Sequence, residues 1–190
     1  MKTIGVLALQ GSFREHLRLL AKLEGVTPLP VKNTEDLARV DGLILPGGES
    51  TAQGKLLRDF ALLEPLKARI RDGLPVWGTC AGLILLAKHI AGGEPPHLGV
   101  MDITVRRNAY GGQLDSFSTT AVLPAVSSEP LPLVFIRAPW IEETGDSVEV
   151  LAERDGRVIA AREGNLLVTS FHPELTGDPR FHAWFVRQIA

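Results

Sequence analysis

The chain lacks the features that mark several classes of protein. Only one of its 190 residues, Cys80, is a cysteine, which excludes an internal disulfide and suits a reducing compartment. No apolar run approaches the roughly 20 residues that a membrane-spanning helix needs. Its 20 Lys and Arg are interspersed among 22 Asp and Glu, for a net charge of −2 at pH 7. We therefore expect a cytoplasmic protein with no membrane segment and no nucleic-acid partner.

We also expect no targeting segment, and the sequence shows no internal repeat and no linker. The apolar run at residues 4–9 is short for a signal peptide and leads into Gln10-Gly11 without a cleavage-like site, so we interpret it as a strand. No stretch is rich enough in Pro, Gly or Ser to mark a boundary between domains. A length of 190 residues is sufficient for one sizeable core. We expect a single domain over residues 1–190.

One stretch in the middle of the chain combines a strand, a sharp turn and a helix. The apolar run 74–77 ends in the pattern Gly78-x-Cys80-x-Gly82, and a helical pattern follows over residues 83–90. This arrangement matches the nucleophile elbow of hydrolases, with Cys where they carry Ser. Glycines let the chain turn back past the nucleophile, and the N-terminus of the following helix favours a thiolate. A buried structural cysteine is the alternative, but the surrounding pattern favours a reactive one.

The order of apolar runs predicts the fold class. Three runs fit central strands that are covered on both faces: residues 4–9, 42–45 and 74–77. Residues 26–31 contain Pro28 and Pro30 and therefore fit only the edge of a sheet. Helical patterns separate these runs, which predicts a doubly wound, mostly parallel α/β sheet flanked by helices. In the C-terminal half, short strands and turns such as Asp155-Gly156 predict appended antiparallel strands.

Capping residues mark two helix starts. The spacing Ser12-x-x-Glu15 is that of a capping box, so we expect Ser12 to cap the first helix. His16 follows on this helix, and we expect its side chain to be solvated or to face a partner. Asp178 and Pro179 predict the start of a last helix that runs to the end of the chain.

A thiol nucleophile requires a base, and the base requires an orienting group. His172 is the candidate base, because it ends an apolar run and is followed by Pro173-Glu174. On an extended path, His172 and Glu174 share one side of the chain, so Glu174 can bind one ring nitrogen while the other faces the thiol. His-Pro-Glu alone is more often a strand end with a surface Glu. Together with Cys80 it predicts a Cys-His-Glu triad.

The loop at residues 46–50, Pro-Gly-Gly-Glu-Ser, follows a central strand as the elbow does. In a doubly wound sheet such loops can meet over the carboxyl ends of the strands. The backbone N–H groups of Gly47, Gly48 and Ala81 are therefore candidates for stabilising an oxyanion. An ordinary Gly-Gly turn is the alternative.

Together these motifs resemble class I glutamine amidotransferases, and in particular the glutaminase subunits of pyridoxal 5′-phosphate synthase. The similarity runs from the first strand to the last helix. It rests on the stretches Leu9-Gln10-Gly11-Ser12 with Glu15-His16, Leu45-Pro46-Gly47-Gly48-Glu49-Ser50-Thr51, Gly78-Thr79-Cys80-Ala81-Gly82, Arg106-Arg107-Asn108-Ala109-Tyr110-Gly111 and Phe135-Ile136-Arg137-Ala138-Pro139. One departure is Gly112, where a basic or polar residue is expected.

The resemblance implies a reaction and a partner. Cys80 would attack the side-chain amide of L-glutamine, ammonia would leave, and water would hydrolyse the thioester to L-glutamate with His172 as general base and acid. The ammonia would pass to a synthase subunit that makes pyridoxal 5′-phosphate, vitamin B6, within a hetero-oligomeric complex. The reaction needs no metal and no cofactor.

The resemblance also implies further site residues. The positions that would bind glutamine or its oxyanion are Gly47, Gly48, Glu49, Ala81, Arg107, Ile136 and Arg137. A guanidinium suits the substrate's α-carboxylate, whereas surface ion pairs are the alternative for both arginines. The loop after the first strand opens at the same edge of the sheet, so the candidates for the partner surface are Gln10, Ser12 and His16.

Three other functions remain open at this point. An amidotransferase domain could serve another synthase, such as one of histidine or tryptophan biosynthesis, although the segments around Gln10, Arg107 and Arg137 argue against it. A Cys hydrolase or peptidase could use a similar sheet. A binding module could carry a vestigial triad, although an intact Cys80, His172 and Glu174 argue against it.

Overall fold

The computed structural model of this chain describes residues 1–107 and 116–189. Residues 108–112 of the sequence resemblance, Gly112 included, lie outside the described residues. The helices of the described chain are α1 (Phe13–Leu20), α2 (Thr34–Ala38), α3 (Ser50–Asp59), α4 (Leu63–Arg71), α5 (Ala81–Leu86), the short 3₁₀ helix η1 (Pro173–Leu175) and α6 (Arg180–Gln188). None of them is long and apolar enough to cross a membrane.

A mixed ten-stranded sheet forms the centre of the molecule. Its strands follow the order β2 (Val26–Val31), β1 (Lys2–Leu7), β3 (Gly42–Leu45), β4 (Val76–Thr79), β12 (Leu166–Thr169), β11 (Arg157–Glu163), β9 (Trp140–Thr144), β6 (Met101–Arg106) and β5 (Ala87–Ile90), with β10 (Glu149–Arg154) beside β11. Strands β2, β1, β3, β4 and β12 are parallel, and β11, β9 and β10 introduce antiparallel pairs. This confirms the predicted parallel sheet with antiparallel strands from the C-terminal half.

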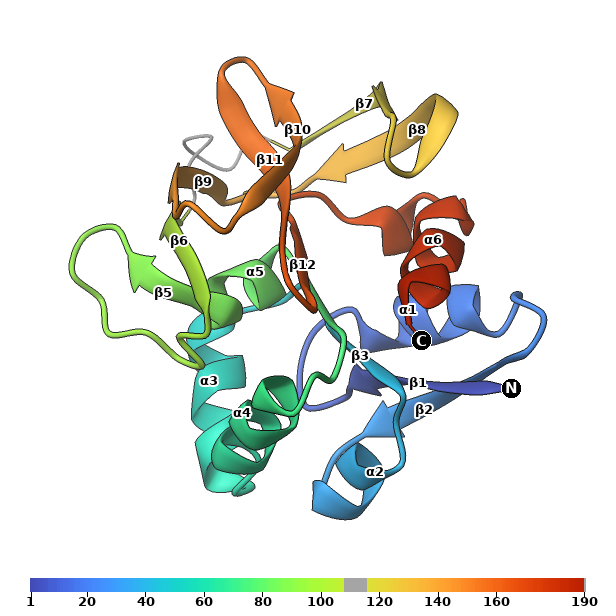
Figure 1. Cartoon of the computed structure of the whole chain (residues 1–190), viewed down its shortest axis with the longest axis vertical. Helices are drawn as coiled ribbons and strands as arrows, with labels where there is room; N and C mark the ends of the chain where they lie inside the picture. Colours follow the sequence, from blue (N-terminus) through green and yellow to red (C-terminus); the bar gives the residue numbers. More distant parts are fainter. Residues whose placement is uncertain (108–115, 190) are drawn as a thin grey trace.

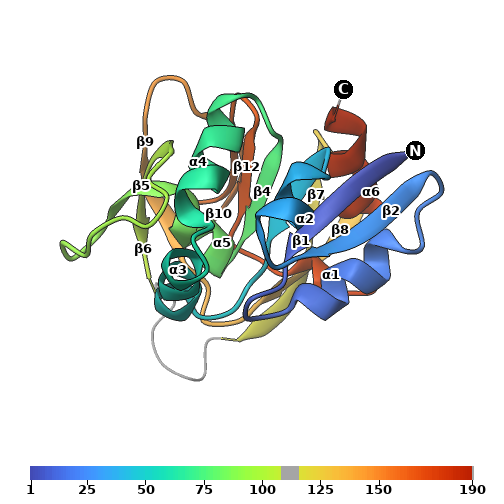
Figure 2. The ribbon, with the colours of Figure 1, turned by 90° about the horizontal axis from the view of Figure 1, so that it is seen from below.

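Two apolar clusters cover the two faces of the parallel strands. Helices α3, α4 and α5 lie on one face, and α1 and α6 lie on the other (Figure 1, Figure 2). A separate hairpin of β7 (Phe117–Leu123) and β8 (Ser127–Phe135) packs on the side of α6. Buried strands such as β3 and β4 contact both clusters, which explains their continuous apolar sequences.

The sequence misjudged two stretches of the fold. The predicted helix over residues 83–90 is wrong after Leu86, because Ala87 to Ile90 extend and pair in parallel with β6. Strand β9 was not predicted at all, since only Ile141 is buried in it and the sequence shows no alternation. The edge position of β2, with its two prolines, is confirmed. The last helix begins at Arg180, two residues after Asp178.

Candidate active site

Three loops and the elbow meet at the carboxyl edge of the parallel strands. They follow β1, β3, β4 and β12, whose shared direction brings their ends to one side of the sheet. A cavity of about 400 Å³ opens there. It is lined by Ser12, Gly47, Gly48, Glu49, Ser50, Cys80, Ala81, Ile84, Arg107, Ile136, Arg137, Pro139, His172 and Leu175. Each predicted catalytic and glutamine-binding residue except Glu174 lies on this wall.

Cys80 sits on a strained turn between β4 and α5. Its backbone has φ 47° and ψ −100°, a conformation that is costly for a residue with a side chain. A Cβ at Gly78 would meet the Gly82 backbone at 2.5 Å, and a Cβ at Gly82 would overlap the Leu45 carbonyl oxygen. The two glycines therefore make the turn sterically possible. Cys80 is buried at the N-terminus of α5, where the helix dipole favours a negative sulfur.

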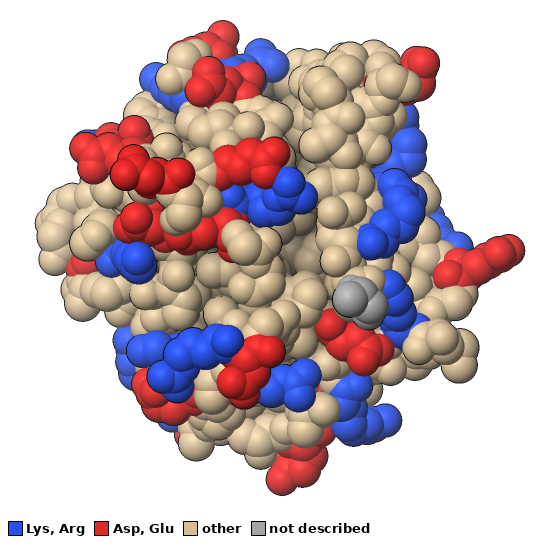
Figure 3. Space-filling view, in the orientation of Figure 1, with Lys and Arg blue, Asp and Glu red and all other residues tan. Residues whose placement is uncertain are grey.

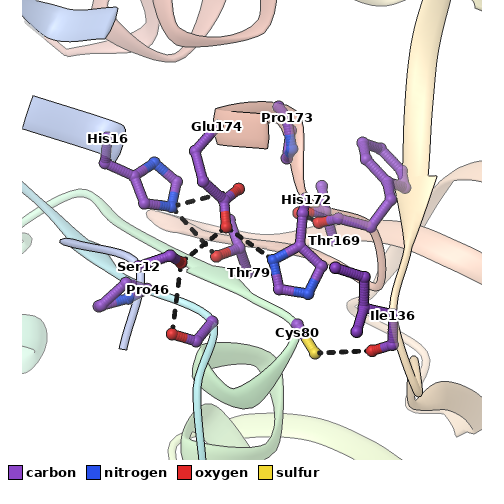
Figure 4. Close-up of polar contacts among 12 residues, drawn as sticks. Ser12, His16, Pro46, Thr79, Cys80, Ile136, Thr169, His172, Pro173 and Glu174 are labelled. Carbon is purple, nitrogen blue, oxygen red and sulfur yellow. Dashed lines mark hydrogen bonds and ion pairs between the residues drawn. The ribbon is translucent and has the colours of Figure 1, made fainter. Parts of the chain in front are cut away.

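His172 and Glu174 meet beside this sulfur. The Nδ1 atom of His172 lies 2.6 Å from Oε1 of Glu174. Figure 4 shows the opposite edge of the imidazole turned toward Cys80. The route is not the predicted extended path: Pro173 starts the helix η1, and this turn brings the Glu174 carboxylate to the Nδ1 edge of the ring. Both side chains are almost fully buried, with the two residues 6% and 5% exposed.

Burial and neighbouring charges set the protonation states of this pair. Burial disfavours a charged imidazole, but the interactions with Cys80 and Glu174 outweigh it and raise the pKa of His172 to about 10. Burial likewise disfavours a carboxylate, but His16, His172 and Ser12 lower the pKa of Glu174 to about 2. At neutral pH the site thus holds an imidazolium between a carboxylate and the sulfur. A cation in that place favours the thiolate form of a cysteine.

The glycine loop after β3 packs directly against the base. A Cβ at Gly47 would overlap the His172 ring, so only glycine allows this approach. The Gly47 carbonyl accepts hydrogen bonds from the Ser12 backbone N–H at 3.0 Å and from the Ser12 hydroxyl at 3.4 Å. Ala81 is the first residue of α5, and an N–H at that position has no partner within the helix. The Ala81 N–H is therefore available as a donor for an oxyanion beside the sulfur.

Two charged residues stand at the mouth of the cavity. Glu49 caps α3 by accepting from the backbone N–H groups of Thr51 and Ala52, at 3.1 and 2.7 Å. Arg107 lies 3.1 Å from Glu49 and 2.8 Å from Glu94. Arg107 therefore lines the cavity and takes part in a surface ion pair at the same time.

Ile136 and Arg137 form the opposite wall. The Ile136 carbonyl oxygen lies 4.0 Å from Sγ of Cys80 (Figure 4). The residue as a whole is 40% exposed. Arg137 adopts φ 43°, a strained value for a residue with a side chain. Within the described residues, no group of three His, Cys, Asp or Glu side chains is arranged to hold a metal ion.

The residues of the first helix are placed differently from the prediction. The Ser12 hydroxyl donates to Oε1 of Glu174 at 2.7 Å and does not cap α1, so the predicted capping box is wrong. His16 has no exposed surface, so the expectation of a solvated or partner-facing side chain is wrong as well. The cause is helical spacing: His16 shares the inward face of α1 with Phe13 and Leu20. Gln10 is partly buried, and its Oε1 accepts from the Glu49 backbone N–H at 2.9 Å.

Sequence reasoning missed other parts of this site. It did not foresee that Ser12 binds Glu174, because 162 positions separate them in the chain. Ile84 and Leu175 also line the cavity, and no sequence signal sets them apart from ordinary core residues.

Comparison with known proteins places this site in a family. The model of the SNO glutamine amidotransferase family matches residues 6–190. A curated relative from Ruminiclostridium cellulolyticum, named pyridoxal 5'-phosphate synthase subunit PdxT, is 56% identical over 189 residues, which cover 100% of both chains. A relative of the same name from Herpetosiphon aurantiacus is 57% identical over 188 residues, covering 97% of this chain and 98% of the relative. A crystal structure described as a glutamine amidotransferase has a TM-score of 0.91 at 45% identity and covers 97% of each chain.

Proposed function

Because the chain belongs to the SNO glutamine amidotransferase family, we propose that it is the glutaminase subunit of a pyridoxal 5′-phosphate synthase. It hydrolyses L-glutamine to L-glutamate and ammonia and delivers the ammonia to a synthase subunit that makes the vitamin. The observation that carries the chemistry is Cys80 on its strained turn, beside a buried His172–Glu174 pair. Relatives that bear the name of this subunit are more than half identical to the chain over at least 97% of its length.

The first half of the reaction forms a thioester. The Cys80 thiolate attacks the side-chain amide carbon of glutamine, and the carbonyl oxygen becomes an oxyanion. The N–H groups of Ala81 and Gly48 are the donors for this oxyanion. The His172 imidazolium then gives its proton to the amide nitrogen, the C–N bond breaks, and ammonia leaves.

The second half hydrolyses the thioester. Neutral His172 takes a proton from water as the water oxygen attacks the thioester carbon. The C–S bond of the resulting intermediate breaks, which releases glutamate and restores the thiolate beside an imidazolium. Glu174 stays ionised throughout and keeps Nδ1 of His172 as the donor, so Nε2 is the atom that exchanges protons with the substrate.

Charged residues at the cavity mouth suit the two ends of the substrate's amino-acid group. Arg107 and Arg137 are the candidates for its α-carboxylate, because a guanidinium grips a carboxylate in a fixed fork. Glu49 is an acceptor for the α-ammonium. Its pKa is lowered, because its bonds to the α3 backbone and to Arg107 outweigh the effect of partial burial, so it is ionised at neutral pH. Ile136 and Gly47 flank the path between these groups and the sulfur.

The synthase partner docks at the same edge of the sheet. Gln10 and Ser12 belong to the loop after β1, which is hydrogen-bonded to the glycine loop of the site. They remain the candidates for contact with the partner, whereas His16 no longer does. We expect the complex in the cytoplasm, with no nucleic acid. Acidic and basic side chains are interspersed over the face shown in Figure 3.

Ammonia release from glutamine tests the proposal. The purified chain is assayed alone and after titration with the synthase subunit of a pyridoxal 5′-phosphate synthase, and Cys80→Ser serves as the blank. Ammonia release that the synthase increases supports the proposal. Cleavage of peptides instead of glutamine would assign a peptidase, and stimulation by a different synthase would assign another amidotransferase.

A further inference from the structure

Two histidines outside the proposed mechanism are completely buried behind the catalytic carboxylate. His16 of α1 and His182 of α6 each have 0% exposure. The Nδ1 atom of His16 lies 2.8 Å from Nε2 of His182. Trp77 of β4 contacts both rings, with centroids 5.7 and 5.0 Å away. Burial of two imidazoles in direct contact is costly unless their polar atoms are used.

The other end of this pair faces Glu174. Nε2 of His16 lies 3.5 Å from Oε2 of Glu174 and 3.3 Å from Oγ1 of Thr79 (Figure 4). The two carboxylate oxygens of Glu174 have different surroundings. Oε1 accepts from His172 and from Ser12, whereas Oε2 is buried and has no hydrogen-bond donor within bonding distance among the described residues. The imidazole of His16 is therefore the polar group that faces the second oxygen.

The arrangement fixes which nitrogens carry protons. If His16 donated from Nδ1 to His182, its Nε2 lone pair would point at a buried carboxylate, and an N–H of His182 would be buried without an acceptor. If instead His182 donates from Nε2, then Nε2–H of His16 faces Oγ1 of Thr79 at 3.3 Å and Oε2 of Glu174 at 3.5 Å. The Nδ1 atom of His182 is then an acceptor without a donor, and no N–H of His182 is left without an acceptor. The second tautomer avoids both penalties.

We propose that His16 is a positioning residue for the glutaminase reaction, holding the free oxygen of Glu174 through its Nε2–H while His182 fixes the tautomer of His16. The row of polar groups that begins at the Cys80 sulfur and includes His172 and Glu174 is then extended by the buried imidazoles of His16 and His182, between α1 and α6. The inference rests on the proposed function for its turnover readout. It concerns the geometry and charge of Glu174, and neither histidine contacts the substrate.

Electrostatics agree with neutral imidazoles in this line. Burial lowers the pKa of His16, against an opposing effect of Glu174, and lowers that of His182 further. The charged or titratable groups that face His16 are Glu174 and His172 from the loop after β12, Glu15 from its own helix and His182 from α6. A neutral imidazole can present an N–H to the carboxylate without competing with His172 for the ion pair.

The experiment compares His16→Leu with His16→Gln. Leucine removes the donor, whereas the glutamine amide places an N–H near the position of the imidazole Nε2. His16→Leu is expected to lower kcat roughly tenfold with KM nearly unchanged, because the polar group that faces the buried Oε2 of Glu174 is lost. His16→Gln should recover most of the loss. His89→Gln, at an exposed histidine on β5, is the matched control and should behave like the wild type.

A second readout does not depend on glutamine. Cys80 is the only cysteine, so its alkylation by iodoacetamide as a function of pH reports on one thiol. In His16→Leu the acid limb of this profile should move to higher pH, since Glu174 is less firmly held as an anion. This measurement still tests the inference if the wild type releases no ammonia from glutamine, an outcome that would refute the proposed function.

Two comparisons distinguish positioning from a structural role. In a Glu174→Gln background, His16→Leu should add little further loss, because the carboxylate through which it acts is gone. His182→Phe keeps a ring against Trp77 and should lower kcat less than His16→Leu does. If His16→Leu does not fold, as judged by circular dichroism, His182→Phe takes its place in both readouts. An unchanged alkylation profile in folded His16→Leu, or in His182→Phe where it takes that place, or an equal loss in both backgrounds, would overturn the inference.

Discussion

Replacing Glu174 with glutamine removes one charge and keeps the shape of the side chain. Oε1 of Glu174 accepts from Nδ1 of His172 at 2.6 Å and from the Ser12 hydroxyl at 2.7 Å. An amide oxygen can still accept from His172, so the ring should keep its orientation. What is lost is the negative charge beside a buried imidazolium.

The structure gives the scale of this loss. A pKa of about 10 for His172, against an ordinary 6.5, corresponds to roughly 5 kcal/mol in favour of the imidazolium. Cys80 and Glu174 both contribute to it. If the carboxylate supplies about half, its removal costs the imidazolium roughly 2.5 kcal/mol, which lowers the equilibrium constant for protonation of His172 about seventyfold. We expect kcat for glutamine hydrolysis to fall by about this factor or somewhat more.

Alkylation of Cys80 with iodoacetamide between pH 5 and pH 10 measures the effect directly. In the wild type, His172 stays protonated up to about pH 10, so Cys80 lies beside a cation throughout the neutral range. In Glu174→Gln the pKa of His172 falls, so the imidazolium persists near pH 7 but is lost before pH 10. The alkylation profile of the variant should therefore depart from that of the wild type mainly between about pH 8 and pH 10, where only wild-type Cys80 still has a cation beside it.

Glu24→Gln, at an exposed glutamate after α1, provides the charge-matched control and should not alter the profile. If Glu174→Gln and the wild type show the same alkylation profile and the same kcat, the carboxylate does not support the ion pair. The reading of the buried His172–Glu174 contact would then be wrong.

Cys80→Ser should reduce glutamine turnover by several orders of magnitude without changing the circular dichroism spectrum, and activity within about tenfold of the wild type would exclude Cys80 as the nucleophile. His172→Asn should be nearly as damaging, and normal turnover would mean that another residue is the base. Arg107→Ala and Arg137→Ala should mainly raise KM for glutamine. An unchanged KM in both would leave these arginines with structural ion pairs only.

Sequence could predict the parallel half of the fold because its strands are buried on both faces. Strands such as β3 and β4 therefore have continuous apolar sequences. The turns that follow them contain glycines, and a glycine next to such a run can be recognised from the sequence alone. The elbow is of this kind, since Gly78 and Gly82 mark a close approach of backbones. Strand β5 was missed because its apolar residues continue the pattern of α5 without a breaker.

The same distinction applies to the residues of the candidate site. Cys80 and Gly47 could be identified because each follows closely after an apolar run, which places it at the end of a predicted strand. The contacts of His16 with His182 and of Ser12 with Glu174 join residues 166 and 162 positions apart. Nothing local distinguishes His16 from a solvated histidine on a helix, and only the packing of α1 against α6 decides it.

Hydrogen bonds connect the loop after β1 to the glycine loop at residues 46–50. The side-chain amide of Gln53 donates to the carbonyls of Gln10 and Pro46, at 3.0 and 3.1 Å. Ser12 N–H binds the Gly47 carbonyl, which places the Gly48 N–H on the opposite side of that peptide. Rotating the peptide would require this bond to break. A partner that binds the loop after β1 can therefore change the orientation of the Gly48 N–H in the glycine loop.

This linkage predicts that the synthase controls glutaminase activity. Glycines can rotate at little steric cost, so the Gly47–Gly48 peptide can present either a carbonyl or an N–H to the oxyanion. A preference of ~3 kcal/mol between the two states changes the competent population more than a hundredfold when that state is rare. The isolated chain should hydrolyse glutamine slowly, and titration with the synthase should raise kcat. Gln10→Ala should weaken this stimulation while leaving Cys80 alkylation unchanged. Full activity in isolation, with no response to the synthase, would refute the switch and leave the roles of Cys80 and His172 intact.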